Sequence, residues 1–388
     1  MRFLHLADLH LGKTVNEISM IPDQKQLLLE QIPDLILKEK IEAVLIAGDV
    51  YDRAIPPEDA VSLLDGFLSK MAAMKIPVLI ISGNHDSDER LNFGSCLFAK
   101  NGIYIAAGYE RQLKHVTLKD TLGEVHFWLL PYVQSSQVRY FYPDDKIESY
   151  EDAVRCVIRH APIDISQRNV ILSHQFVTGG PASPSDPLLS GSEVKALNVG
   201  TLDRISSDVY EAFDYVALGH IHRPQVVGAE SVRYAGSPLK YSQSEADQVK
   251  YFTIVDLGKK ETAPKITLLP VRLPHEMRLL RGPFMELMKP ENIIYPDDYI
   301  FVTLTDRAPI PDAFSIIQDH YRNAMGLRYE SLESSAVKEE DQSRSGQDKK
   351  TFDRQLRDFA LAVRGADLTD EELAVLLDAA KEAGVSES

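Results

Sequence analysis

The chain has 388 residues, of which 44% are hydrophobic and 26% are charged, and this is the composition of a globular protein rather than of a disordered one. At roughly 100–200 residues per domain, the length predicts two or three domains. The net charge of −16 argues against a general nucleic-acid-binding protein, because such proteins usually carry a basic surplus.

The predicted elements begin at the first residues. The stretch from Met1 to Asp8 contains an acid and no small-residue cleavage site, so we expect a strand there rather than a secretory signal. No apolar run reaches about 18 residues, so no transmembrane helix is predicted. The two cysteines, Cys96 and Cys156, exclude a disulfide framework and a cysteine zinc site and are typical of a reducing cytoplasm.

Strand-like apolar runs alternate with helical patterns up to about residue 225, which predicts a layered α/β domain. Consecutive Val, Ile and Leu positions indicate strands that are buried on both faces. The strands are expected at 3–7, 43–47, 78–82, 125–130, 170–173 and 215–218, and the helices at 23–40, 57–75 and about 89–100. Further short runs at 232–235, 252–256 and 266–269 predict a strand-rich second half of the same core, as in a sandwich.

The pattern changes after residue 270, so we place a first domain at 1–270 and a small second one at 271–330. The second domain contains a strand-like run at 299–304 and a helical pattern at 311–325. Residues 331–350 are mostly polar and are typical of a flexible linker.

The tail, 351–388, shows two amphipathic helical patterns, the second preceded by a capping box of Thr369 and Glu372. These helices either fold back on the body or dock on a helix of a partner, and the linker before them favours docking. The apolar positions expected to contact the partner are Phe352, Leu356, Phe359, Val363, Leu373, Leu376 and Leu377.

Polar side chains follow several predicted strands at the point where each strand ends. In an open α/β sheet these ends lie along one edge, where ligands bind, so we expect the side chains to converge on one site. The candidates are Asp8, His10, Asp49, Asn84, His85, His174, His220 and His222.

The candidate donors are carboxylate, imidazole and amide groups without a thiolate, and they exceed what one tetrahedral ion needs, which favours two ions. The spacing of two between Asp8 and His10, and between His220 and His222, puts both side chains on one face where the backbone is extended. Glycines at 48, 83 and 219 are expected to let the backbone turn at the strand ends.

Five short segments together resemble the motifs of the calcineurin-like metallophosphoesterases. They are Asp8-Leu9-His10, Gly48-Asp49, Gly83-Asn84-His85-Asp86, His174 and Gly219-His220-Ile221-His222. The resemblance covers about residues 1–270 and implies a four-layer α/β/β/α sandwich with a small α+β capping domain and a C-terminal helical tail.

The resemblance also implies the role of each motif residue. Asp8, His10 and His222 would hold a first metal, Asn84, His174 and His220 a second, and Asp49 would bridge both. His85 would contact the phosphate and protonate the leaving oxygen. The ions would be two Mn²⁺ per chain, with Fe or Zn as alternatives, and they would clamp a phosphodiester and activate a water molecule. Asp52 stands where some relatives have a second catalytic histidine, so its role is open.

The chain length, Tyr234-Ala235-Gly236-Ser237-Pro238 and the linker with its tail are similar to SbcD nuclease subunits. This similarity implies a DNA nuclease that works with an SbcC-type ATPase, bound through 351–388, in a heterotetramer near the nucleoid. Such a complex is an ATP-dependent double-strand exonuclease and a single-strand and hairpin endonuclease in DNA repair, recombination and replication.

Two other enzymes and one non-enzyme remain alternatives. A phosphomonoesterase is suggested by Asp52-Arg53, although Asp86 and Ala54 depart from the protein Ser/Thr phosphatase signature. A small-nucleotide phosphodiesterase would suit the charge of −16. A scaffold with a dead site would require a missing ligand, and every motif ligand is present.

Apolar side chains on the 57–75 and 89–100 patterns either pack in the core or form a homodimer interface, and the resemblance favours a homodimer. They are Val61, Leu64, Leu68, Met71, Leu91, Phe93 and Leu97. Basic residues near the motifs are candidates for contacts with the backbone phosphates of DNA. They are Lys13, Arg53, Arg90, Arg139, Arg223 and Lys240. We expect the chain alone to bind DNA weakly and in a salt-sensitive way.

Overall fold

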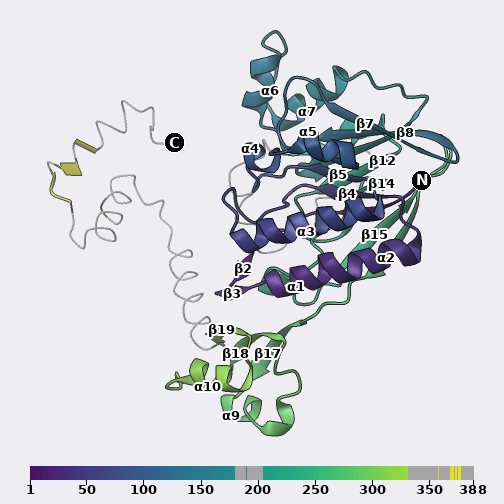
Figure 1. Cartoon of the computed structure of the whole chain (residues 1–388). Coiled ribbons are helices and arrows are strands. Elements are labelled where there is room, and N and C mark those ends of the chain that lie inside the picture. The colour runs from purple at the N-terminus through teal and green to yellow at the C-terminus, as the bar shows by residue number, and fades with distance from the viewer. Residues whose placement is uncertain are drawn as a thin grey trace. The chain divides into compact units, whose positions relative to one another are not determined.

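The computed structural model of the chain is shown in Figure 1. It describes residues 1–179, 189, 204–330, 357, 368–370, 372, 373, 375 and 376. The chain divides into two compact units. One contains Met1–Thr303 and Pro311–Leu327, and the other contains Leu304–Ile310 and Arg328–Ser388, of which only part is described.

The first six-stranded sheet carries the strand that begins the chain at its centre. Its order is β16-β15-β1-β4-β5-β6, in which β1, β4, β5 and β6 are parallel and β15 is antiparallel to both of its neighbours, β1 and β16. The strands are β1 (Arg2–Leu6), β4 (Ala43–Ala47), β5 (Val78–Ile81), β6 (Ile103–Ala106), β15 (Tyr251–Asp256) and β16 (Lys265–Pro270). The late strands therefore complete the sheet that the N-terminal strand starts, as the sandwich prediction requires.

The second six-stranded sheet has the order β13-β14-β12-β9-β8-β7. Its strands β8, β9, β12 and β14 are parallel, and the edge strands β7 and β13 are antiparallel to their neighbours. The strands are β7 (Lys114–Asp120), β8 (Gly123–Leu130), β9 (Arg168–His174), β12 (Tyr215–Gly219), β13 (Gln225–Val227) and β14 (Ala229–Tyr234). The prediction of a mixed α/β fold is confirmed.

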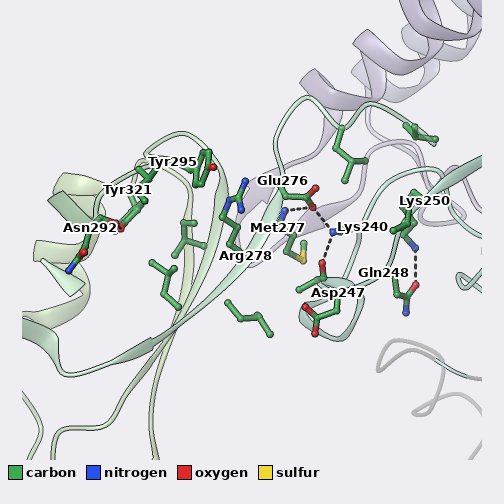
Figure 2. Close-up of a pocket in the computed structure, with 18 residues that line it drawn as sticks. Lys240, Asp247, Gln248, Lys250, Glu276, Met277, Arg278, Asn292, Tyr295 and Tyr321 are labelled. Atoms are coloured by element: carbon green, nitrogen blue, oxygen red, sulfur yellow. Dashed lines mark hydrogen bonds and ion pairs between the residues drawn. The ribbon is translucent and has the colours of Figure 1, made fainter. Parts of the chain in front are cut away.

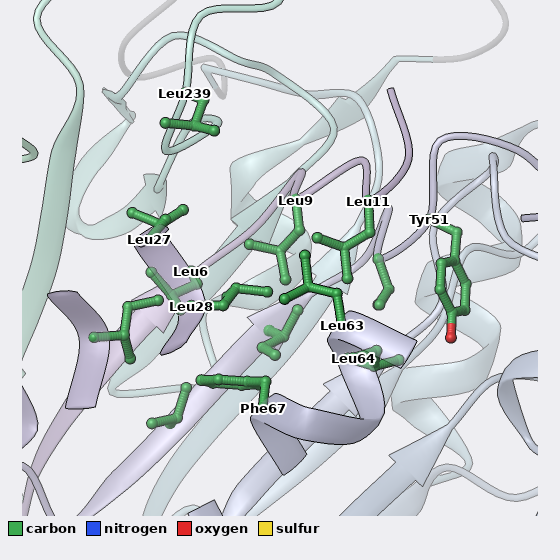
Figure 3. Close-up of a cluster of buried hydrophobic side chains, with 14 of the residues drawn as sticks. Leu6, Leu9, Leu11, Leu27, Leu28, Tyr51, Leu63, Leu64, Phe67 and Leu239 are labelled. Atoms are coloured by element: carbon green, nitrogen blue, oxygen red, sulfur yellow. The ribbon is translucent and has the colours of Figure 1, made fainter. Parts of the chain in front are cut away.

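Three hydrophobic clusters show how the layers pack. Because side chains alternate along a strand, Phe3 faces the second sheet while Leu4 packs under the helices. The cluster around Phe3 joins the inner faces of the two sheets, with Phe3 and Phe127 edge to face at 5.8 Å. A second cluster joins the first sheet to α3 (Glu58–Met74) and its neighbours, as Leu63, Leu64 and Phe67 show in Figure 3, and a third covers the outer face of the second sheet.

The helices on the first sheet are α1 (Ile21–Gln26), η1 (Leu27–Gln31), α2 (Ile32–Glu39) and α3 (Glu58–Met74). The predicted helix at 23–40 is therefore interrupted by the π-helical turn η1. Its cause is Pro33, which has no N–H to donate and whose ring would collide with the carbonyl four residues earlier in a regular α-helix.

The predicted helix at 89–100 is three short pieces, α4 (Asp88–Leu91), α5 (Ser95–Phe98) and η2 (Ala99–Asn101). On the second sheet lie α6 (Ser135–Phe141) and α7 (Tyr150–Arg159), which the sequence analysis did not predict. The remaining short elements are β2 (Thr14–Val15), β3 (Ile18–Ser19), β10 (Val177–Thr178), β11 (Ile205–Ser206), η4 (Ser207–Tyr210) and η5 (Gln243–Glu245).

The region after residue 270 contains a three-stranded sheet of order β17-β18-β19. Its elements are β17 (Met277–Gly282), α9 (Phe284–Leu287), η6 (Pro290–Asn292), β18 (Tyr299–Leu304), α10 (Ala313–His320) and β19 (Ala324–Tyr329). The helix predicted at 311–325 ends at His320, and the residues after it form β19 instead, where main-chain bonds to a neighbouring strand outweigh local helical preference.

In the tail, the predicted capping box is present. The main-chain N–H of Glu372 donates to Oγ1 of Thr369 at 3.3 Å, and that of Thr369 donates to Oε2 of Glu372 at 2.8 Å. Leu373 is half-buried and Leu376 is exposed. The 331–350 linker lies outside the described residues. So do the other apolar positions expected to contact a partner, which are Phe352, Leu356, Phe359, Val363 and Leu377. Within the described part of the chain, no helix has the length and apolarity needed to cross a bilayer.

His5 lies between the two sheets and provides a test of this packing. Its Nδ1 lies 2.9 Å from the hydroxyl of Tyr215 and its Nε2 lies 3.2 Å from the carbonyl oxygen of Leu218. Burial lowers the pKa of His5 from 6.5 to about 3. Below about pH 6.5, His5 therefore takes up a proton in the unfolded chain but not in the folded protein. The free energy of unfolding consequently decreases as the pH is lowered.

We predict that His5→Phe weakens this acid sensitivity. Each pH unit below the unfolded pKa costs the wild type about 1.4 kcal/mol through His5, so from pH 7 to pH 5 the variant should lose about 2 kcal/mol less stability. Urea unfolding of both proteins at the two pH values, with a chelator present, measures this difference. Equal losses in the two proteins would show that His5 is not buried in its neutral form.

Candidate metal centre

The structure brings the predicted site residues together at the carboxyl ends of five parallel strands. Asp8 and His10 follow β1, Asp49 follows β4, and Asn84 and His85 follow β5, three strands that are neighbours in the first sheet. His174 ends β9, and His220 and His222 follow β12, its neighbour in the second sheet. The packing of the sheets therefore makes one site from segments more than 200 residues apart.

The backbone at the site is left-handed at several predicted ligands. The φ angles are 53° at Asp8, 43° at His10, 47° at Asp49 and 99° at His220. Non-glycine residues rarely adopt such angles, and they concentrate at functional sites. The backbone is therefore not extended at Asp8 and His10, so the condition for placing them on one face by their spacing is not met, and tight turns direct these side chains instead.

The glycines at the strand ends have two different roles. Gly48 has a φ of 86°, so the predicted turn role is correct there. Gly83 and Gly219 are needed for close approach instead. A Cβ atom on Gly83 would lie 2.1 Å from Oδ1 of Asp49, and one on Gly219 would lie 1.9 Å from the carbonyl oxygen of Ala47.

The first group of side chains, which we call the His10–His222 half, consists of Asp8, His10, Asp49 and His222. Nε2 of His10 lies 3.1 Å from Nε2 of His222 and 3.6 Å from Oδ2 of Asp49. Ligand atoms of Asp8, His10 and Asp49 all lie within 4.8 Å of one another, and all three residues are buried.

The second group, which we call the Asn84–His174 half, consists of Asn84, His174, His220 and again Asp49. Oδ1 of Asn84 lies 3.2 Å from Nε2 of His174 and 3.0 Å from Nδ1 of His220. Nε2 of His174 lies 3.3 Å from Oδ2 of Asp49. The same carboxylate oxygen of Asp49 therefore faces both halves, which is the position that a bridging ligand requires.

Burial and mutual charge perturb the site strongly. Burial raises the pKa of Asp8 to about 6 and lowers the pKa of His10 to about 4. Burial also opposes the charged form of His174, but the Asp49 carboxylate outweighs it and raises the pKa of His174 to about 9. Buried carboxylates and imidazoles that share protons in this way can exchange them for a cation, since metal ligands must be deprotonated.

The donor atoms fit divalent cations. Oδ2 of Asp8 is buried without a hydrogen-bond partner among the described residues. A buried oxygen that lacks a partner is costly, and a cation would supply one. The set combines hard carboxylate and amide oxygens with borderline imidazoles, which suits Mn²⁺, Fe or Zn²⁺. The residues thus fit a metal pair, while the assignment of each ligand to one ion remains a prediction.

His85 lies at the exposed edge of the site. Its ring is perpendicular to that of His10 at 4.8 Å between ring centres, and its Nδ1 lies 2.8 Å from the main-chain oxygen of Asp52. The Asp52 side chain faces Nδ1 of His10 at 3.5 Å and pairs with Lys13. Asp52 thus contacts His10 through its side chain and His85 through its main chain. It does so at the position where some relatives have a second catalytic histidine.

Asp86 belongs to one of the five motifs, but no metal-binding or catalytic role is predicted for it. Its carboxylate accepts hydrogen bonds from the main-chain N–H groups of Val50 and Gly83 at 3.0 and 2.9 Å, and of Tyr51 at 2.9 Å. It therefore ties the Asp49 turn to the Asn84 turn. Sequence analysis missed Glu245 altogether, although its carboxylate lies 3.3 Å from Nδ1 of His222, because no motif surrounds it.

A two-sheet α/β fold that gathers buried Asp and His side chains at its strand ends is the arrangement of a metal-dependent phosphoesterase. The family model described as Calcineurin-like phosphoesterase matches residues 1–224, which include every predicted ligand and His85. The chain belongs to the calcineurin-like phosphoesterase family.

Replacing Asp49 tests the shared site. Because its carboxylate faces both halves, Asp49→Ala should remove both ions, whereas Asp34→Ala, at an exposed acid of α2, should keep them. Metal per chain, measured by mass spectrometry after loading and desalting, should fall from two ions to near none. Full metal content in Asp49→Ala would place the ions elsewhere.

Proposed function

We propose that this phosphoesterase is a Mn²⁺-dependent DNA nuclease of the SbcD type. The observation that carries the proposal is the convergence of the seven metal-binding candidates on one edge, with His85 at its exposed side. DNA as the substrate is supported by the similarity of 234–238, the linker and the tail to SbcD subunits.

The chemistry follows from where the side chains lie. The two halves would hold divalent ions, which would supply positive charge to the phosphate and lower the pKa of a water molecule. Nδ1–H of His85 donates to the main-chain oxygen of Asp52, so it is the Nε2–H of the imidazolium form that passes to the departing sugar oxygen and leaves a neutral ring. Asn84 and His85 are exposed while Asp8 and Asp49 are buried, so a phosphate reaches the site from the His85 side.

The basic side chains divide into two groups. Lys13 pairs with Asp52, Arg139 donates to the carbonyl oxygen of Ile147, and Lys240 pairs with Glu276, so these three hold the fold. Arg53, Arg90 and Arg223 are exposed, and these support contact with DNA phosphates.

His85→Ala should keep both metal ions and lose turnover. Removing a general acid typically costs about 10²–10⁴-fold in rate, so cleavage of supercoiled plasmid with Mn²⁺ should fall by that factor. Comparison with p-nitrophenyl phosphate tests the alternative. Faster hydrolysis of this monoester than of DNA would favour a phosphomonoesterase, and loss of metal from His85→Ala would mean that His85 is a ligand.

We further propose a homodimer that binds an SbcC-type ATPase through 351–388. Leu64, Leu68 and Met71 are buried, so these three pack in the core and are not part of the homodimer interface that we propose. Val61, Phe93 and Leu97 are 46, 82 and 65% exposed, however, and Val61 and Phe93 line a groove of about 600 Å³ together with Phe98. This exposed apolar surface supports contact with a second copy.

Two variants should separate the two interfaces. Phe93→Glu places a charge on the exposed apolar surface and should give monomers by light scattering at micromolar concentration, with ATPase binding kept. Removing 351–388 should abolish copurification with the ATPase and leave dimers. A monomeric wild type would refute the dimer, and ATPase binding by the shortened chain would refute the role of the tail.

A further inference from the structure

A segment beyond the family match lies behind one half of the metal centre. The 237–250 segment connects β14 to β15 and contains the short helix η5. Leu239 belongs to the same buried cluster as Leu9 and Leu27, as Figure 3 shows. The hydroxyl of Tyr241 donates to the carbonyl oxygen of Leu9 at 2.5 Å, so the segment is fixed to the turn that carries His10.

At the centre of this segment is a fully buried carboxylate. Oε1 of Glu245 lies 3.3 Å from Nδ1 of His222 and accepts a hydrogen bond from the hydroxyl of Ser242 at 2.9 Å. Oε2 accepts one from Nζ of Lys250 at 2.6 Å. The side chains of Glu245 and Lys250 both have no exposed surface, so this is a fully buried ion pair.

Lys250 also holds the backbone of His222. Its Nζ donates to the main-chain oxygen of His222 at 3.0 Å, and the main-chain N–H of Ser237 donates to the same oxygen at 3.1 Å. The segment therefore fixes both the main chain and the ring of one predicted ligand.

The outer end of the segment is anchored as well. Nζ of Lys240 donates to the carbonyl oxygen of Ala246. Figure 2 shows its contact with the carboxylate of Glu276, and Lys250 beside Gln248. These contacts limit how far Glu245 can move away from His222.

We propose that Glu245 is a positioning residue for the His10–His222 half, with Lys250 as its counter-charge. Accepting the Nδ1–H of His222 fixes the tautomer in which Nε2 carries the lone pair, directs the ring, and strengthens it as a donor to a cation. This inference rests on the metal centre of the proposed function and adds a residue that acts on one of the two ions.

The Asn84–His174 half is held by different contacts. Nδ1 of His174 lies 2.8 Å from the carbonyl oxygen of Ala47, at the end of β4. The main-chain N–H of His220 donates to Oδ1 of Asp8 at 2.8 Å. Strand ends orient this half, so loss of Glu245 should weaken the binding of one ion and spare the other.

The energetics favour a functional role for this pair. Removing two charges from water costs several kcal/mol per ion, and well-packed apolar side chains often replace a buried pair without loss of stability. The Glu245–Lys250 pair is thus expected to add little to the free energy of unfolding. An oriented carboxylate beside an imidazole ligand, by contrast, changes the affinity for the metal directly.

The test uses Glu245→Gln combined with Lys250→Met, so that no unpaired charge stays buried. The matched control is Asp120→Asn with Arg168→Met, which removes another buried ion pair, with side chains 3 and 5% exposed, away from the predicted ligands. Circular dichroism and thermal unfolding verify that both double variants are folded.

Calorimetric titration of the metal-free proteins with Mn²⁺ should give two sites in the wild type and in the control. In the Glu245 variant, one site should weaken by about 10–100-fold while the other keeps its affinity. At limiting Mn²⁺, paramagnetic resonance should then change from a coupled pair to isolated Mn²⁺.

The outcomes separate the two hypotheses. A wild type that binds no Mn²⁺ overturns the metal centre and this inference with it. A wild type with two sites, and a variant with the same two affinities, overturns the role of Glu245 alone. Equal weakening of both sites in the variant, or weakening in the control, overturns its selectivity for the His10–His222 half.

Discussion

The site depends on how closely the carboxyl ends of the two sheets approach each other. His174 of the second sheet hydrogen-bonds to the carbonyl oxygen of Ala47 in the first, and its ring faces Asp49. At Gly219 a single Cβ atom would overlap the first sheet. Sheets that approached less closely would leave Asp49 out of reach of one half, and no shared site would exist.

This approach concentrates charge where water cannot screen it. Asp8 and Asp49 are buried among histidines, and their pKa values move in opposite directions. Burial raises the pKa of Asp8, whereas at Asp49 the opposing effect of burial is outweighed by His174, His10 and His85 together, so the pKa is lowered. A pair of divalent cations satisfies such a set better than shared protons do. The same cations would offset the acidity of a chain with a net charge of −16 where a phosphate binds.

Some of the residues that support the site lie within the sequence motifs, and others lie far from any motif. Asp86 follows a motif histidine directly and ties two turns together. Glu245 lies 23 residues after His222 and contacts its ring directly, while a buried ion pair joins Glu245 to Lys250. Asp52 is a third case. It stands where some relatives have a histidine, it pairs with Lys13, and its carboxylate faces Nδ1 of His10.

The sequence by itself determined the mixed α/β class, the central strands and the set of polar residues that meet, because buried strands and strand-end residues leave periodic local signals. Tertiary structure alone decided the strand that replaces the end of the helix predicted at 311–325, the left-handed turns at the ligands and the place of Glu245. These features depend on which segments pack against each other, and no local pattern encodes the distance between residues that are far apart in the chain.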